Sequence, residues 1–281
     1  AIIILVSIIY FIFYFTNLTM NNVLPLIGVF SGAAFKFLPS ANRLISAFNR
    51  IRYGNKSTQM ILSDLKLKKK INAEHIKKFE YIELKNLYFK YDEKQIFNNL
   101  NFKISTNDKI FIYGDTGSGK STLIDIILGL KKPVSGDIFI NKKNYSKSNF
   151  TLSEILGYVP QSVFLFDDSI KNNITLFNPD VSNQKIDISI KISKLEGFLR
   201  SLKGKEDSLV GQNGIKLSGG QKQRIGIARE IYKKPEVFIF DESTNSLDKD
   251  TEKEFMNDFL NHSENKTVIM VSHNQNLKKF F

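Results

Sequence analysis

Nine consecutive residues in the middle of the sequence have the types and spacing that bind phosphate. The segment GDTGSGKST follows the apolar stretch Lys109–Tyr113 and leads into the helix-like segment STLIDIILGL. Glycines let backbone N–H groups surround a β-phosphate, a lysine ammonium reaches the β- and γ-phosphates, and a serine hydroxyl binds Mg²⁺. These residues predict a nucleotide phosphate site with Mg²⁺: Gly114, Asp115, Thr116, Gly117, Ser118, Gly119, Lys120, Ser121 and Thr122.

Two carboxylates follow Val237–Phe240, a segment with the composition of a parallel strand buried on both faces. Ligands of open α/β sheets bind at the carboxyl ends of such strands. We expect Asp241 to bind Mg²⁺ and Glu242 to accept a proton from an attacking water.

Two more polar side chains follow strand-like segments. His273 comes just after Thr267–Val271, where it could contact a γ-phosphate or the water, although a lone histidine at a strand end is more often structural. Gln161 follows Pro160, and its side-chain oxygen could reach Mg²⁺ or the water. One glutamine alone is weak evidence for either role.

A second glycine turn predicts another anion site. The segment Lys216–Glu230 places Ser218, Gly219 and Gly220 at the start of an amphipathic helix, where free N–H groups and the helix dipole attract an anion. The phosphate loop of the same chain already accounts for one nucleotide. A second anion pocket therefore predicts that two chains share two nucleotides.

The distribution of charge divides the chain into three parts. Its net charge is +12, yet residues 1–35 contain no charged side chain. An apolar segment followed by basic residues is typical of a membrane helix with a cytoplasmic flank. We predict the last two helices of a membrane domain in residues 1–52, the first one truncated. A helical extension or linker should follow in 53–78, and a soluble α/β domain in 79–281. Cysteine is absent, which excludes disulfides and thiolate metal sites.

Five segments together carry a family resemblance. In order, GDTGSGKST, YVPQ, LSGGQ, VFIFDE and VSH resemble the nucleotide-binding domain of ATP-binding cassette (ABC) transporters, over about residues 79–281. The resemblance implies an α/β P-loop NTPase fold with a helical subdomain, preceded by the C-terminal part of an all-α transmembrane domain. It also implies ATP and Mg²⁺ as ligands, and ATP hydrolysis coupled to transport.

The same resemblance implies partners and further site residues. A second copy, or a homologous half-transporter, would complete each ATP site, because LSGGQ closes over the ATP bound by the partner's phosphate loop. This role falls to Ser218, Gly219, Gly220 and Gln221. Tyr91 in LYFKY would stack on adenine, Gln161 would sense the membrane helices, and Asn245–Asp248 would cross the dimer interface. Family members often carry alanine at the position of Ser246, and Glu242 and His273 match a hydrolysis-competent site.

Exporters of this family fuse six membrane helices to each cassette, so both ends of this chain look truncated. The resemblance implies an integral protein of the bacterial inner membrane, with its nucleotide-binding domain in the cytoplasm and membrane lipid around it. The segment AAFKFLPSANRLISAFNRIRY is similar to the last membrane helix of lipid-linked oligosaccharide flippases. Lys36, Arg43 and Arg50 could meet a pyrophosphate-linked sugar lipid, but export of peptides, proteins or drugs stays open.

Two other classes of protein share parts of this pattern. A chromosome-associated ATPase would suit the basic charge, but those proteins divide the cassette with a long coiled coil. The segment between Ser121 and Ser218 is short and lacks sustained heptads. A soluble importer cassette would lack the apolar N-terminal segment. We therefore expect no nucleic acid among the partners.

Overall fold

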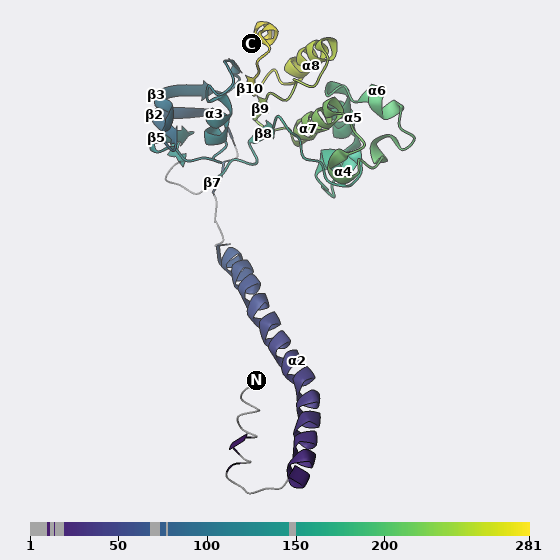
Figure 1. Ribbon diagram of the computed structural model, residues 1–281. Helices are drawn as coiled ribbons and strands as arrows, with labels where there is room; N and C mark the ends of the chain where they lie inside the picture. The colour runs from purple at the N-terminus through teal and green to yellow at the C-terminus, as the bar shows by residue number, and fades with distance from the viewer. Residues whose placement is uncertain (1–9, 12–13, 15–19, 68–73, 77, 146–149) are drawn as a thin grey trace. The chain divides into compact units, whose positions relative to one another are not determined.

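The computed structural model describes residues 10–11, 14, 20–67, 74–76, 78–145 and 150–281. The chain divides into two compact units, Ala1–Ile71 and Asn72–Phe281. Figure 1 shows both units and labels most of their helices and strands.

One helix makes up most of the described part of the first unit. Helix α2 runs unbroken from Met20 to Leu67 over 48 residues, with Pro25 and Pro39 inside it. It therefore continues past residue 52 into the segment expected to be a helical extension. Most of the first of the two expected membrane helices, and most of the loop after it, lie outside the described residues.

Within the part of the chain that the structure describes, no helix is both long enough and apolar enough to cross a membrane.

The second unit is built on a parallel sheet of four strands in the order β4-β10-β9-β8. The strands are β4 (Lys109–Ile112), β8 (Leu156–Val159), β9 (Val237–Asp241) and β10 (Thr267–Val271). The apolar segments of the sequence thus form the expected strands, although β4 ends one residue earlier and β9 extends to Asp241. The predicted α/β fold is confirmed.

Alternate side chains of the central strands enter two different cores. Phe238 and Phe240 of β9 belong to one buried cluster, whereas Val237 and Ile239 belong to the other. All five residues of β9 and of β10 are buried. A parallel strand covered on both faces needs apolar residues at every position, which explains the continuous apolar runs.

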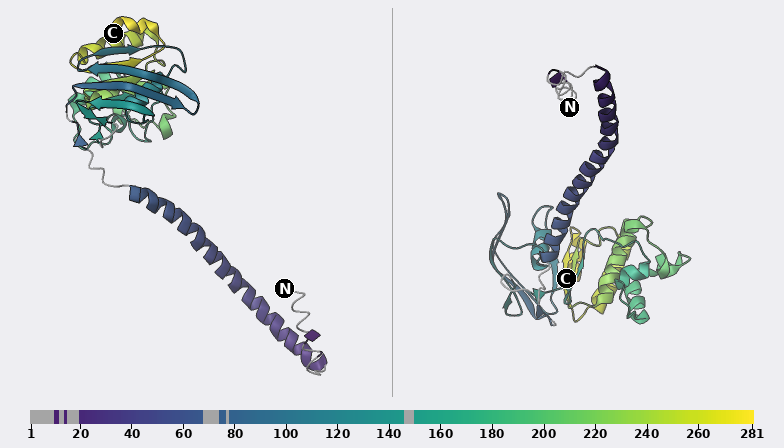
Figure 2. Two further views of the ribbon diagram at one scale, coloured as in Figure 1. Left: turned by 90° about the vertical axis from the view of Figure 1, so that its left-hand side faces the viewer. Right: turned by 90° about the horizontal axis from the view of Figure 1, so that it is seen from below.

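A second sheet and one helix cover the first face of the parallel sheet. The antiparallel order is β3-β2-β5-β6, formed by β2 (Tyr81–Tyr91), β3 (Lys94–Ser105), β5 (Ser135–Ile140) and β6 (Lys143–Asn144). Helix α3 (Lys120–Ile127) lies between the two sheets and buries Ile124, Ile126 and Ile127 (Figure 2). The short strands β1 (Glu74–His75) and β7 (Phe150–Thr151) pair in parallel.

Helices cover the other face. Helices α7 (Gly219–Lys233) and α8 (Lys249–His262) pack on this face. The remaining helices are α4 (Ile170–Thr175), α5 (Asn183–Ile192) and α6 (Glu196–Arg200), with short 3₁₀ turns η2 (Lys205–Asp207), η3 (Gln212–Gly214) and η4 (Gln275–Phe280). Helices α4 and α5 pack on α7 and form the expected helical subdomain beside the sheet (Figure 1). Phe255 and Phe259 of α8 pack their rings against the phenylalanines of β9.

Candidate active site

The phosphate loop connects β4 to α3, as the sequence pattern requires. Lys120 is the first residue of α3, is 8% exposed, and donates hydrogen bonds to the carbonyls of Gly114 (2.9 Å) and Asp115 (3.0 Å). The helix cap Gly119 has a φ of 97°, a left-handed conformation that glycine adopts without strain. The Lys120 ammonium is therefore held inside the curve of the loop. The loop's remaining predicted residues, Thr116, Gly117 and Ser118, are exposed.

A buried carboxylate lies next to the start of α3. Asp241 is 6% exposed; its Oδ1 accepts from the Ser121 hydroxyl and its Oδ2 from the Tyr158 hydroxyl, both at 3.4 Å. Burial raises the pKa of Asp241, and the Ser121 hydrogen bond opposes that rise. Burial, with the nearby charge of Asp241, raises the pKa of Tyr158 as well. Desolvation thus penalises the Asp241 carboxylate where a cation would stabilise it.

These two side chains fit a Mg²⁺ site. Mg²⁺ binds hard oxygen ligands and is usually held by one or two carboxylates together with substrate phosphates. Ser121 supplies a hydroxyl and Asp241 a carboxylate oxygen, and both adjoin the phosphate loop.

A second carboxylate is held between three side chains, two of which come from other segments. Glu242 follows β9; its Oε1 lies 2.5 Å from Nε2 of His273, and its Oε2 accepts from the amides of Gln161 (3.1 Å) and Asn245 (3.4 Å). The Glu242 side chain is 13% exposed and that of His273 is 40% exposed. Glu242 has a φ of 52°, which is unusual for a residue with a side chain. The structure therefore brings the predicted residues Gln161, Glu242 and His273 into contact.

The ends of neighbouring strands place these residues. In the parallel register, Val271 of β10 pairs with both Ile112 of β4 and Asp241 of β9. The Glu242 amide continues this pairing by donating to the Val271 carbonyl at 2.9 Å. The phosphate loop, Glu242 and the residues after β10 thus leave the sheet at one edge.

The second glycine turn is the start of α7. Ser218 caps the helix: its hydroxyl accepts from the Gln221 amide (3.3 Å), while Gln221 Oε1 accepts from the Ser218 amide (2.9 Å). This capping box engages the side-chain oxygen of Gln221 within its own helix. Among the described residues, none of the hydrogen bonds of Ser218–Gln221 reaches the phosphate loop of the same chain.

Tyr91 lies beside the start of α3. Its hydroxyl contacts the Lys131 ammonium and, at 3.4 Å, the hydroxyl of Thr122, while the ammonium also lies 4.7 Å from the centre of the Tyr91 ring. The hydrogen bond from Lys131 lowers the pKa of Tyr91. Asp125 holds the same ammonium at 2.9 Å. The Tyr91 ring is 40% exposed and so offers aromatic surface next to the phosphate loop.

Sequence reasoning missed several contacts of the site. Tyr158 was not singled out, although it lies three residues before Gln161 on β8, next to β9. Asn245 was assigned to a dimer interface, but its side chain also reaches Glu242. An amide three residues after a strand-end carboxylate is a signal that could have found it.

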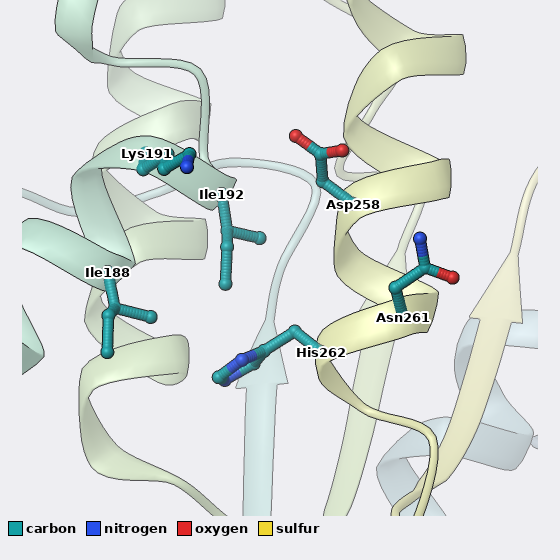
Figure 3. A pocket seen from close by; sticks show the side chains of 6 residues that line it. All are labelled: Ile188, Lys191, Ile192, Asp258, Asn261 and His262. Carbon is teal, nitrogen blue, oxygen red and sulfur yellow. The ribbon is translucent and has the colours of Figure 1, made fainter.

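A separate pocket lies between α5 and α8. It has a volume of about 310 Å³ and is lined by Ile188, Lys191, Ile192, Asp258, Asn261 and His262 (Figure 3). Burial and the nearby Lys234 lower the pKa of His262. None of the predicted site residues lines this pocket.

The raised pKa of Asp241 predicts a stability effect. A carboxyl group whose pKa is raised on folding binds its proton more tightly in the folded state than in the unfolded state. The stability that this proton contributes is lost as pH rises above the ordinary aspartate pKa and through the raised folded-state pKa. We expect Asp241→Asn to raise the melting temperature of the nucleotide-free and Mg²⁺-free chain by a few degrees at pH 7. The gain should shrink as pH falls toward and below the ordinary aspartate pKa.

Asp168→Asn is the matched control for this measurement. Hydrogen bonds from the Ser169 backbone and the Asn172 side chain lower the pKa of Asp168, so removal of its charge should reduce stability at pH 7. A melting temperature that falls at pH 7 in the Asp241 variant would contradict the assignment of a desolvated carboxylate.

Residues 97–245 match the protein family described as ABC transporter. A protein of Rickettsia typhi named as an export ATP-binding/permease protein is 37% identical over 196 residues, which is 68% of this chain and 34% of the relative. The alpha-hemolysin translocation ATP-binding protein of Escherichia coli O157:H7 is 39% identical over 195 residues, 68% of this chain and 28% of the relative.

A solved structure agrees with these relatives. The structure of a bacterial Atm1-family ABC exporter with ATP bound has a TM-score of 0.68 and 30% identity, covering 73% of this chain and 37% of that one. The chain thus spans about a third of the length of the proteins it matches. The family match includes the phosphate loop, the LSGGQ segment and the carboxylates Asp241 and Glu242. This chain belongs to the ABC transporter family.

Proposed function

We propose that this chain is the ATP-hydrolysing part of an ABC exporter. The observation that carries the proposal is the contact of Gln161, Glu242 and His273 at the sheet edge from which the phosphate loop also departs. Attack by water on a γ-phosphate requires a site that binds the phosphates and, beside that site, a carboxylate held in position.

Each residue has a proposed role in that reaction. Lys120 binds the β- and γ-phosphates, and Ser121 with Asp241 would hold Mg²⁺, which when bound neutralises charge on the phosphates. Glu242 orients a water and accepts its proton while the water oxygen bonds to the γ-phosphorus. The bond from that phosphorus to the bridging oxygen breaks and releases ADP. Gln161 and His273 keep the Glu242 carboxylate in position.

The proposed working unit is a pair of such chains, identical or homologous. Helix α7 begins at a glycine turn in which Ser218 caps the Gln221 amide, while the amides of Gly219 and Gly220 have no acceptor within the helix and so form a suitable site for an anion. Because that turn makes no hydrogen bond to its own phosphate loop among the described residues, we propose that it binds the γ-phosphate of ATP held by the partner. Tyr91 would stack on the adenine.

The proposed location is the bacterial inner membrane, with the nucleotide-binding domain in the cytoplasm. Relatives named as export ATP-binding/permease proteins support export across a membrane. The cargo is a finer proposal. The proposed cargo is a lipid-linked oligosaccharide, and export of a protein or peptide is the main competing proposal. Relatives are named for alpha-hemolysin translocation, leukotoxin export and transport of iron-sulfur clusters. These names give no support to flipping of a lipid-linked oligosaccharide.

Two substitutions separate nucleotide binding from hydrolysis in the complete transporter reconstituted in lipid nanodiscs. Glu242→Gln keeps the shape of the side chain but cannot take a proton, so phosphate release should fall by about 100-fold or more while ATP affinity stays. Lys120→Ala should instead abolish measurable ATP binding, because it removes the ammonium that meets the phosphates. Rapid phosphate release by Glu242→Gln would refute its role as the base.

The shared site can be tested by cross-linking in the complete transporter, since residues 1–281 contain no cysteine and any cysteine outside them is first replaced by serine. We introduce Ser118→Cys in the phosphate loop and Lys216→Cys just before α7, both at exposed positions. With Glu242→Gln and ATP present, a short bifunctional thiol reagent should join two chains and give a band of twice the mass. The single-cysteine variants serve as controls. A product that stays within one chain, or that forms equally without ATP, would rule out the shared site.

The cargo proposal predicts selective stimulation of hydrolysis. We expect a lipid-linked oligosaccharide to raise the ATPase rate several-fold in nanodiscs, with Glu242→Gln as the blank and hydrophobic drugs as the negative control. Stimulation by unfolded peptides instead of the glycolipid would replace flipping by protein export. The ATPase proposal would stand in both cases.

A further inference from the structure

One buried amide on α7 connects two segments of the site. Gln223 is 5% exposed. Its Nε2 donates to the carbonyl oxygen of Gln161 at 3.2 Å, and its Oε1 accepts from the backbone amide of Ser246 at 3.1 Å. The segment after β8 and the segment after β9 are therefore held by opposite ends of the same side chain.

The two segments that Gln223 holds are those whose side chains meet Glu242. Gln161 and Asn245, the neighbour of Ser246, both donate to Glu242 Oε2. The contacts close a ring that runs from Gln223 through Gln161 to Glu242, and back through Asn245 and Ser246. A shift of either segment would turn an amide away from the carboxylate.

Two glycines of α7 let both segments approach the helix on either side of Gln223. A Cβ on Gly220 would lie 2.7 Å from the Ser246 carbonyl oxygen, and one on Gly226 would lie 2.6 Å from Cγ2 of Val163. Real Cβ atoms essentially never come so close, so a side chain at either position would displace a segment. Helix α7 therefore forms a close-fitting support for both.

Only an amide of this length satisfies both contacts. The Gln161 carbonyl needs a donor and the Ser246 N–H needs an acceptor, and a glutamine side chain presents one of each. A carboxylate would place an oxygen against the carbonyl, and an apolar side chain would leave both backbone groups without this partner, which is costly in a buried site.

We propose that Gln223 is a positioning residue for ATP hydrolysis, which fixes Gln161 and Asn245 on Glu242 and joins them to the start of α7. The inference rests on the proposed function. The start of α7 is the proposed contact with the partner's ATP. Closure of the dimer on that ATP would therefore move α7, and with it Gln223 and the two segments that hold Glu242. Gln223 touches neither the nucleotide nor the water.

The test is Gln223→Met in the complete transporter in nanodiscs. Methionine keeps the length and fits the buried space, but makes neither hydrogen bond. We expect kcat for ATP hydrolysis to fall by about 10-fold or more while KM stays within about twofold, since the phosphate loop is untouched. Hydrogen exchange of the Ser246 amide should become at least about 10-fold faster. Gln223→Glu, which keeps the acceptor for Ser246, should restore slow exchange but not kcat.

Lys222→Met is the matched control. Its ammonium donates to the carbonyl of Asn213, outside the ring around Glu242, so kcat and Ser246 exchange should both stay within about twofold of the unmodified protein. A kcat retained in Gln223→Met, or a KM that rises in proportion to the loss, would overturn the inference. An unmodified protein without ATPase activity would instead refute the proposed function, and the exchange of Ser246 would still decide whether Gln223 holds that segment.

Discussion

The parallel register of β4, β10, β9 and β8 is the constraint on which the rest of the site depends. Because Val271 pairs with both Ile112 and Asp241, three strands reach the same edge of the sheet together. Side chains distant in the sequence meet there without any long loop to carry them. The continuous apolar strands supply the rigidity, since each is buried on both faces and one slipped residue would exchange the two cores.

Helix α7 is the second element that positions the residues of the site. Its amino end is fixed by a reciprocal cap, its second turn carries the amide that holds two segments, and its remaining turns are buried against the sheet and the helical subdomain. The first turn, proposed to contact the partner's ATP, and the segments that hold Glu242 are thus connected through one rigid element. Such an arrangement transmits small displacements, because close-packed helices move as units.

The sequence predicted the parts of the site that depend on residue type and strand ends. The phosphate loop, the carboxylates after β9 and the helix at Ser218 follow from local patterns, and the structure has the elements in those places. The missed contacts all depend on tertiary neighbours. The hydroxyl of Tyr158 reaches Asp241 only because β8 lies beside β9, and Gln223 acquires a role only once two segments fold over α7. The side chain of Gln221, a residue expected at the partner's nucleotide, also closes the cap of its own helix. Periodicity and spacing carry no information on such pairings.

The backbone of Glu242 has a consequence for how this protein could change over time. A non-glycine residue with a φ of 52° is strained by about 1–2 kcal/mol, and glycine would relieve that strain. The backbone at this position therefore favours glycine, whereas the contacts of the carboxylate with Gln161, His273 and Asn245 hold the side chain. Under the proposed role of Glu242, selection for ATP turnover would keep the carboxylate there. In a duplicated copy freed from that selection, replacement of Glu242 by glycine would relieve the backbone strain, and the protein would lose turnover while it still folds.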